Sequence, residues 1–168
     1  MDEAGLAPLA PALARIEHVH DARSLARLLG ATVRADVDPL GLGVIESASV
    51  LGLSVEHSIH GENNYTAFLV QGGLALGDRN QYLSREARTV EQRARYRKYI
   101  ARMLTLAGFD RVDQRAESVL ALETAIAESQ ATSQASAVDR NADNQWSRAD
   151  FAREAPGMRY FLLVHATG

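Results

Sequence analysis

The sequence contains no cysteine among its 168 residues. This absence excludes disulfide bonds, thiolate catalysis and cysteine-based metal centres, so a metal would need ligands from histidine, aspartate or glutamate. No apolar stretch approaches the roughly 20 residues that span a bilayer. Asp2 and Glu3 also stand where a secretory signal would carry basic residues. These features predict a cytoplasmic chain without membrane contact, and we expect no cofactor.

Neither sign of charge is in large excess. The chain has 18 basic and 21 acidic residues and a formal net charge of -3, so nucleic acid is not expected as a partner. Basic residues concentrate only within residues 85–102, interleaved with acidic ones, a pattern typical of a solvated helix face. With 46% apolar residues, the length is sufficient for one domain with its own core. We therefore expect residues 1–168 to form a single domain.

Helical periodicity dominates the sequence. It predicts helices around residues 9–16, from the capping residue Asp21 to 33, over 89–107 with a stop at Gly108, and from 110 toward 131. A shorter helix follows Ser147 and ends before Pro156. We expect the first two helices to pack as a pair, and the segment ESQATSQASAV, residues 128–138, to be a fraying end or a flexible connector.

A change to alternating apolar and polar residues predicts one β-hairpin, with strands at residues 51–57 and 65–71. The polar stretch SIHGENN separates them. Because two strands alone are marginal in water, we expect this hairpin to lie against helices. Residues 35–53 are ambiguous between helix and strand. The expected fold class is mainly α, a helical bundle-like domain with one small β-hairpin.

The string QGGLALGDRNQYL, residues 71–83, resembles the signature Gln-Gly-Gly-Leu-Gly-Leu-Pro-Asp-Arg-Asp-Tyr-Tyr-Leu of neprilysin-like zinc metallopeptidases. The segments MDEAGLAPLAPALARI, YRKYIARMLTLAG, VLALETAIAES and APGMRYFL resemble other parts of that family's N-terminal lobe, in the same order. The likeness covers nearly the whole chain. In those enzymes this lobe is a mainly helical cap over the substrate chamber, so the resemblance implies a binding function.

The chain departs from the family in ways that bear on function. Gly77 stands where the family has proline, Asn80 where it has aspartate, and Gln81 where it has the first tyrosine. The family's zinc motif, His-Glu-x-x-His, has no match, so no catalytic residue is carried over and we expect the catalytic zinc lobe to be lacking. The signature itself favours a structural interpretation. Its glycines, Gly72 and Gly73, would permit a sharp turn, while its charged pair, Asp78 and Arg79, would tie the loop to nearby backbone.

Three groups of residues are candidates for chemistry. His57 and His60 lie within EHSIHGEN and could contribute metal or acid–base chemistry, although a polar hairpin tip is the favoured interpretation. Glu123 lies inside the apolar stretch LALETAIA, where a partly buried carboxylate could transfer protons, although pairing with an arginine of the preceding helix is favoured. Aromatic residues that could line a ligand pocket, or simply form core, are Tyr65, Tyr82, Tyr96, Tyr99 and Trp146.

Three functional hypotheses follow. The leading one is a stand-alone, non-peptidase domain derived from a cap lobe, which binds a peptide, a protein or a small ligand. The first alternative is the cap subunit of a split peptidase, with a partner chain supplying the zinc lobe and the apolar RYFLLV segment as part of the contact. The second is a small metal-independent enzyme that uses Glu123, His57 or His60 in a helical pocket. Homo-oligomer formation is left open.

Overall fold

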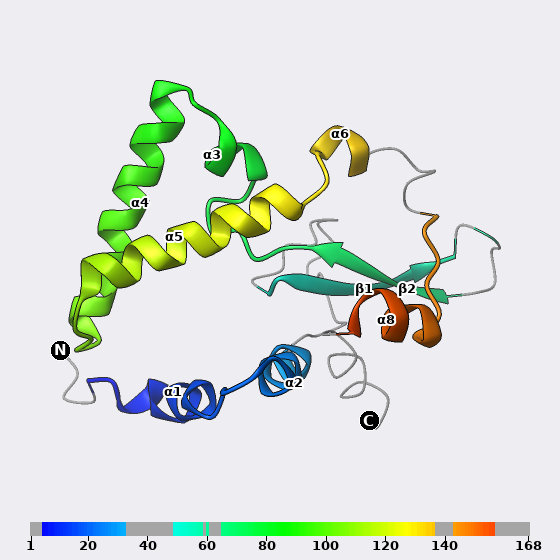
Figure 1. The fold of residues 1–168 in the computed structure, drawn as a ribbon, viewed down its shortest axis with the longest axis horizontal. Coiled ribbons are helices and arrows are strands. Elements are labelled where there is room, and N and C mark those ends of the chain that lie inside the picture. The colour runs from blue at the N-terminus through cyan, green and yellow to red at the C-terminus, as the bar shows by residue number, and fades with distance from the viewer. Residues whose placement is uncertain (1–4, 33–48, 59, 61–64, 137–142, 157–168) are drawn as a thin grey trace.

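The computed structural model describes residues 5–32, 49–58, 60, 65–136 and 143–156 (Figure 1). Over these ranges the chain is mostly helical with one two-stranded antiparallel sheet, which confirms the expected fold class. Of the ambiguous residues 35–53, residues 35–48 lie outside the described residues, whereas residues 51–53 belong to a strand. The C-terminal segment 157–168, with RYFLLV, also lies outside the described residues. Whether residues 1–168 form a single domain stays a prediction.

The N-terminal segment contains a 3₁₀ turn, η1 (Ala7–Leu9), and the helices α1 (Ala10–Glu17) and α2 (Ala22–Thr32). Asp21 caps α2 as predicted, since its Oδ1 accepts from the backbone N–H of Ser24 at 2.7 Å. The expected packing of the two helices as a pair is wrong. The two helices follow one another along the chain but do not pack extensively together in the described part of the molecule (Figure 1).

The hairpin consists of β1 (Leu51–His57) and β2 (Tyr65–Gln71), with the bounds that the sequence predicts. The strands pair antiparallel over their full length. The expectation that helices cover this hairpin is not met within the described part of the chain, where no helix packs extensively on either strand. The hairpin is instead joined to the helices at the end of β2.

The largest helical unit is formed by α3 (Arg79–Leu83), α4 (Ala87–Leu106) and α5 (Val112–Ser129). The two long helices meet at the turn between them and diverge, and α3 contacts both (Figure 1). Gly108 ends α4 as predicted. It takes a φ of +76°, and beyond it the N–H of Phe109 donates to the carbonyl of Leu104 at 3.0 Å.

Two short helices complete the described chain, α6 (Ser133–Ser136) and α8 (Arg148–Glu154). The prediction of a fraying or flexible connector is wrong for α6, because the Thr132 hydroxyl accepts from the N–H of Ala135 at 3.1 Å and caps this turn. The predicted cap of α8 is confirmed. Ser147 and Asp150 form a reciprocal capping box at its start.

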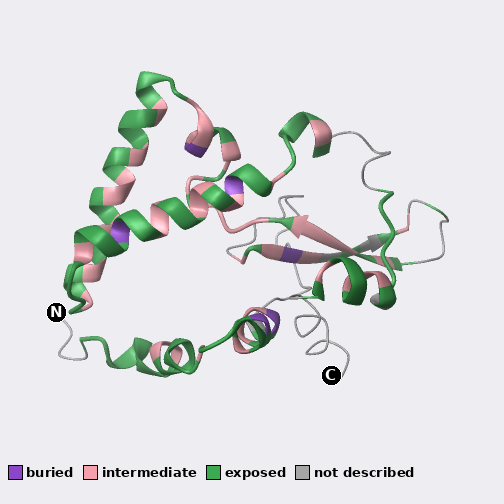
Figure 2. Ribbon diagram, in the orientation of Figure 1, coloured by how far each residue is buried: buried purple, intermediate pink, exposed green. Residues whose placement is uncertain are grey.

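Burial is sparse and centred on α5 (Figure 2). Among the described residues no large side chain is fully buried. No helix in the described ranges is long and apolar enough to cross a membrane. The buried apolar residues of the described chain are Ala26, Tyr82, Ala116 and Ala127.

Candidate functional site

The signature segment, residues 71–83, leaves β2 through two left-handed glycines. Gly73 has a φ of +80°, and a Cβ there would lie 2.9 Å from the Cα of Val50. Gly77 has a φ of +84°. The prediction of a glycine-dependent turn at Gly72 and Gly73 is confirmed for Gly73. Gly72 has no positive φ, and the second left-handed glycine is Gly77. Proline cannot adopt a positive φ, so Gly77 gives this loop a backbone that the family's proline would forbid.

The charged residues of the signature segment tie it to the helices, as predicted. Asp78 Oδ1 accepts from the backbone N–H of Asn80 at 2.7 Å and caps α3, while its Oδ2 accepts from the Ser133 hydroxyl at 3.2 Å. Arg79 Nε donates to the carbonyl of Ala127 at 3.3 Å. The segment is therefore fixed to the last turns of α5 and to α6.

Side-chain amides make a second tie at the end of β2. Gln71 donates from Nε2 to the carbonyl of Ala131 at 3.1 Å and accepts at Oε1 from its N–H at 3.0 Å. Gln130 donates to the carbonyl of Gly72 at 2.8 Å. These three bonds use backbone groups just beyond α5 and β2, where neither element supplies a partner.

Glu123 is the centre of a polar cluster between the three helices. Its Oε2 accepts from the hydroxyl of Tyr82 at 2.8 Å, and its Oε1 accepts from the hydroxyl of Tyr96 at 3.0 Å. The Tyr82 oxygen in turn accepts from the backbone N–H of Leu76 at 3.0 Å. We call these three side chains the Glu123 cluster. It links α3, α4, α5 and the signature segment through one carboxylate.

The environment of the cluster keeps its phenols protonated. Burial, and secondly the hydrogen bond to Glu123, raise the pKa of Tyr96 to about 12. The pKa of Tyr82 is also raised well above its ordinary value by burial, with the same carboxylate adding to the effect against the backbone N–H of Leu76. At neutral pH both phenols therefore donate hydrogen bonds to the Glu123 carboxylate, and these bonds connect α3 and α4 to α5.

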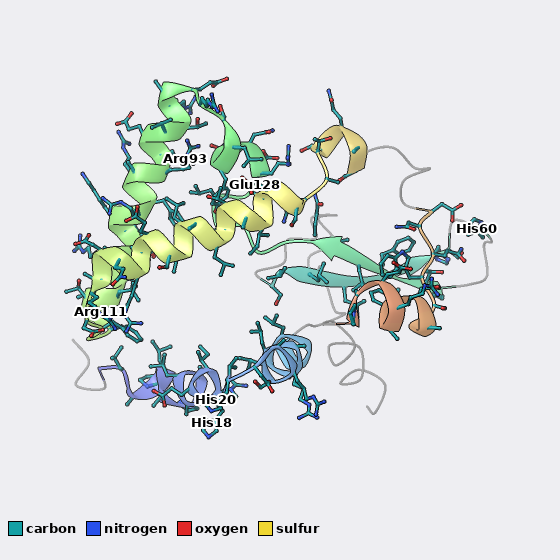
Figure 3. All side chains as sticks on the ribbon, in the orientation of Figure 1. His18, His20, His60, Arg93, Arg111 and Glu128 are labelled. Carbon is teal, nitrogen blue, oxygen red and sulfur yellow. The ribbon has the colours of Figure 1, made fainter. Side chains whose placement is uncertain are left out.

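The favoured pairing of Glu123 with an arginine of α4 is wrong, because the two phenols occupy both carboxylate oxygens. Arg93, on the side of α4 that faces α3 (Figure 3), donates from Nη1 to the carbonyl of Gln81 at 2.7 Å. The side-chain oxygen of Gln81 is buried and has no hydrogen-bond partner among the described residues. Sequence reasoning singled out Tyr82, Tyr96 and Glu123 separately, and only the fold brings them together.

The two candidate histidines have different partners. The ring of His57 lies 4.5 Å from that of Tyr65, its cross-strand neighbour. His60 Nε2 lies 2.6 Å from Asp143 Oδ1, a contact across 83 residues of sequence that no sequence pattern indicated. His18 and His20 lie beside α1, at the other end of the molecule from His60 (Figure 3). In the described chain no three His, Asp or Glu side chains gather as a metal site.

The five aromatic candidates for a pocket or for core do not come together in one place. Tyr82 and Tyr96 meet at Glu123, but Tyr65 and Tyr99 are exposed on the hairpin and on α4. Trp146 packs its ring 4.8 Å from that of Phe151 in α8. The chain's own described residues therefore fit neither a zinc ion of the metallopeptidase kind nor a single aromatic pocket, whereas they form a well-connected structural junction.

Comparison with known proteins identifies relatives of this arrangement. Residues 1–166 match the sequence profile of peptidase family M13, in the form that describes its N-terminal region. The chain is 33% identical to mouse endothelin-converting enzyme-like 1 over 85 residues, or 51% of this chain and 11% of that protein. The human protein of the same name is 31% identical over 101 residues, or 58% of this chain and 13% of its own length.

A solved structure extends the likeness to the fold. The cryo-electron microscopy structure of the Mycobacterium tuberculosis zinc metalloprotease ZMP1 in its open state aligns with 95% of this chain, with a TM-score of 0.76 and 25% identity. The aligned part is 24% of that protease chain. The chain thus spans between about a tenth and a quarter of the length of these relatives, and the resemblance inferred from the signature segment is confirmed.

Proposed function

Because this chain belongs to peptidase family M13, we propose that it is a non-catalytic binding domain of that family, which holds a protein surface against its helices. The observation that carries the proposal is the exposure of three large apolar side chains on α4 and α5. Tyr99, Leu106 and Leu122 are 59%, 67% and 63% exposed on the two longest helices. Apolar side chains on a helix that has no further layer are typical of contact surfaces.

A protein partner is favoured over a small ligand. Polar groups that converge on one point in a fold are the usual anchor for a small molecule, but both oxygens of Glu123 already accept from tyrosines. For the same reason no specific observation favours the acid–base enzyme hypothesis. The exposed residues of α4 and α5 instead lie along helix faces, which suit an extended contact with another helix or lobe.

The proposal is tested on the purified chain by two measurements. Hydrolysis of a quenched fluorescent peptide library is expected to stay at the buffer rate with and without added zinc. Native mass spectrometry of the chain isolated from its own host is expected to show a bound polypeptide. Zinc-dependent hydrolysis that co-purifies with the chain through two columns would contradict a non-catalytic role.

A second candidate is the cap of a split peptidase, with the zinc-binding lobe of an M13 enzyme as the partner. The structural likeness to one quarter of a zinc metalloprotease chain favours it. Mixing this chain with a separately produced zinc lobe from the same host is expected to increase peptide hydrolysis over the lobe alone. An unchanged rate, together with no complex by sedimentation, would exclude this partner and leave other proteins.

A further inference from the structure

The solvent side of α4 carries side chains at alternating spacings of four and three residues, which is the spacing of a helix–helix seam. Every one of them is exposed, and α4 shows exposed stretches along its whole length (Figure 2). At 1.5 Å per residue the row is about 27 Å long. We call it the α4 seam, and it consists of Arg88, Gln92, Arg95, Tyr99, Arg102 and Leu106.

The C-terminal half of the seam is apolar. Tyr99 is 59% exposed and Leu106 is 67% exposed, and between them Met103 is 47% exposed beside the row. The three residues follow one another at spacings of four and three, so they form one patch on one side of the helix. Exposure of such an apolar patch to water is unfavourable, and covering it with another apolar surface lowers the free energy.

Cations surround this patch. The side chains of Arg88, Lys98 and Arg102 make no ion pair or hydrogen bond with any other residue in the described ranges. Arg95 contacts only Glu91 of the same helix, at 2.6 Å, an exposed pair that holds the guanidinium weakly. The α4 seam is therefore locally positive on a chain whose formal net charge is -3.

We propose that the α4 seam is the docking site of an acidic amphipathic helix from a partner protein. The exposed row suits a partner helix, because a second helix can place its own side chains between these at the same repeat. The uncompensated cations select acidic residues at its flanks. Tyr99, Met103 and Leu106 select an apolar stripe at its centre. The inference rests on the proposed function, because it names the chemistry of the protein that this domain binds.

Other occupants fit less well. A symmetric dimer through the α4 seam would bring the cations of both copies into one interface, and the seam contains no acidic residue to neutralise them, which is unfavourable. A nucleic acid would contact the cations but would leave the aliphatic side chains of Met103 and Leu106 without apolar partners. An acidic helix satisfies both kinds of side chain.

The probe for this proposal is a fluorescein-labelled synthetic helical peptide with leucine at the seam positions and glutamate at the flanks. The control peptide carries lysine in place of every glutamate. Fluorescence anisotropy is expected to show saturable binding of the acidic peptide only. Raising the salt concentration from about 50 mM to 500 mM is expected to weaken it, since the attraction between exposed charges is screened.

Two variants with matched controls locate the contact. Leu106→Ser is expected to weaken peptide binding about tenfold, because the apolar surface that the leucine side chain buries against the peptide is lost. Leu9→Ser changes a leucine of η1 that is also exposed and is expected to have no effect. Arg102→Glu is expected to weaken binding about fivefold or more, whereas Arg15→Glu on α1 is expected to leave it unchanged. Circular dichroism confirms that each variant is folded.

Each other outcome overturns the proposal. Equal binding of the acidic and lysine peptides would mean non-specific apolar contact. Insensitivity to both Leu106→Ser and Arg102→Glu would place the contact elsewhere. If sedimentation shows that Arg102→Glu dissociates a dimer, the occupant is a second copy. Should these variants still bind the native host partner with unchanged affinity, the seam assignment fails while the binding function stands.

Discussion

At the scale of single residues, Glu123 connects three helices through two phenol hydrogen bonds. Glu123→Gln keeps the shape of the side chain but leaves one phenol without an acceptor. We expect the free energy of unfolding to fall by about 1–3 kcal/mol, the cost of an unsatisfied buried polar group. Urea denaturation measures this change. Glu117→Gln on the exposed side of the same helix is the control, and an equal loss there would contradict a specific role for the cluster.

The phenols of the cluster predict a response to alkaline pH. The pKa of Tyr96 is about 12 and that of Tyr82 is also raised. A raised pKa in the folded state means that the stabilisation is complete below the ordinary phenol value near 10 and is lost as the pH rises through about 12. Absorbance at 295 nm should therefore keep rising beyond pH 11, and Tyr96→Phe should remove part of that late rise. A titration complete by pH 11 would contradict it.

Gly73 and Gly108 separate two costs of adding a side chain. Both have a positive φ, but only at Gly73 would a Cβ meet other atoms, with the Cα of Val50 at 2.9 Å. We expect Gly73→Ala to lower the free energy of unfolding by about 1 kcal/mol or more beyond the loss in Gly108→Ala. Thermal denaturation of the two variants side by side measures the difference. Equal losses would mean that the backbone near Val50 moves aside freely.

At the scale of elements, α8 depends on its capping box. Asp150 accepts from the side chain and N–H of Ser147, and these bonds, followed by one from Arg153, lower its pKa to about 2. A lowered pKa in the folded state gives stabilisation that is present above the ordinary value near 4 and is lost as the pH falls through about 2. NMR titration of the Asp150 carboxyl should show this midpoint. In Ser147→Ala the midpoint should move up toward 4, and amide exchange in α8 should speed up.

Elements with a strong local signal were predictable from sequence. The hairpin bounds followed from the two-residue period and the polar stretch between the strands, and α4 ended at Gly108 because a left-handed residue there stops the helix. The short α6 was missed because its composition, rich in serine and alanine, resembles a linker. The packing of α1 with α2 was wrongly expected because amphipathic patterns show that a face is apolar without showing which element covers it.

At the scale of the whole molecule, the candidate site was only partly predictable. The sequence indicated that Glu123 lies on an apolar face and that Tyr96 falls on a helix, but it did not predict α3, which carries Tyr82. The convergence of the three side chains depends on how α3 fits between α4 and α5. The contact of His60 with Asp143 joins residues 83 positions apart, and no local pattern encodes such a pair. Tertiary packing decides both, so the site emerged only with the fold.

The core of the described chain is sparse. Within the ranges that the structure describes, three of the four buried apolar residues are alanines, and an alanine contributes little buried area. Several larger apolar side chains of α4 and α5, among them Tyr99, Leu106 and Leu122, are exposed. These are the side chains that a partner protein would cover.

The hydrogen bonds between Gln71 and Ala131 have one more consequence. They bring together two points that lie 60 residues apart in sequence, so the signature segment, α3, α4 and α5 start and finish at the same place. A stretch whose ends coincide can be transplanted into a surface loop of an unrelated host without stretching that host's backbone. Residues 71–131 are therefore suited to insertion as a unit into a loop of another protein, and the inserted segment would include the α4 seam.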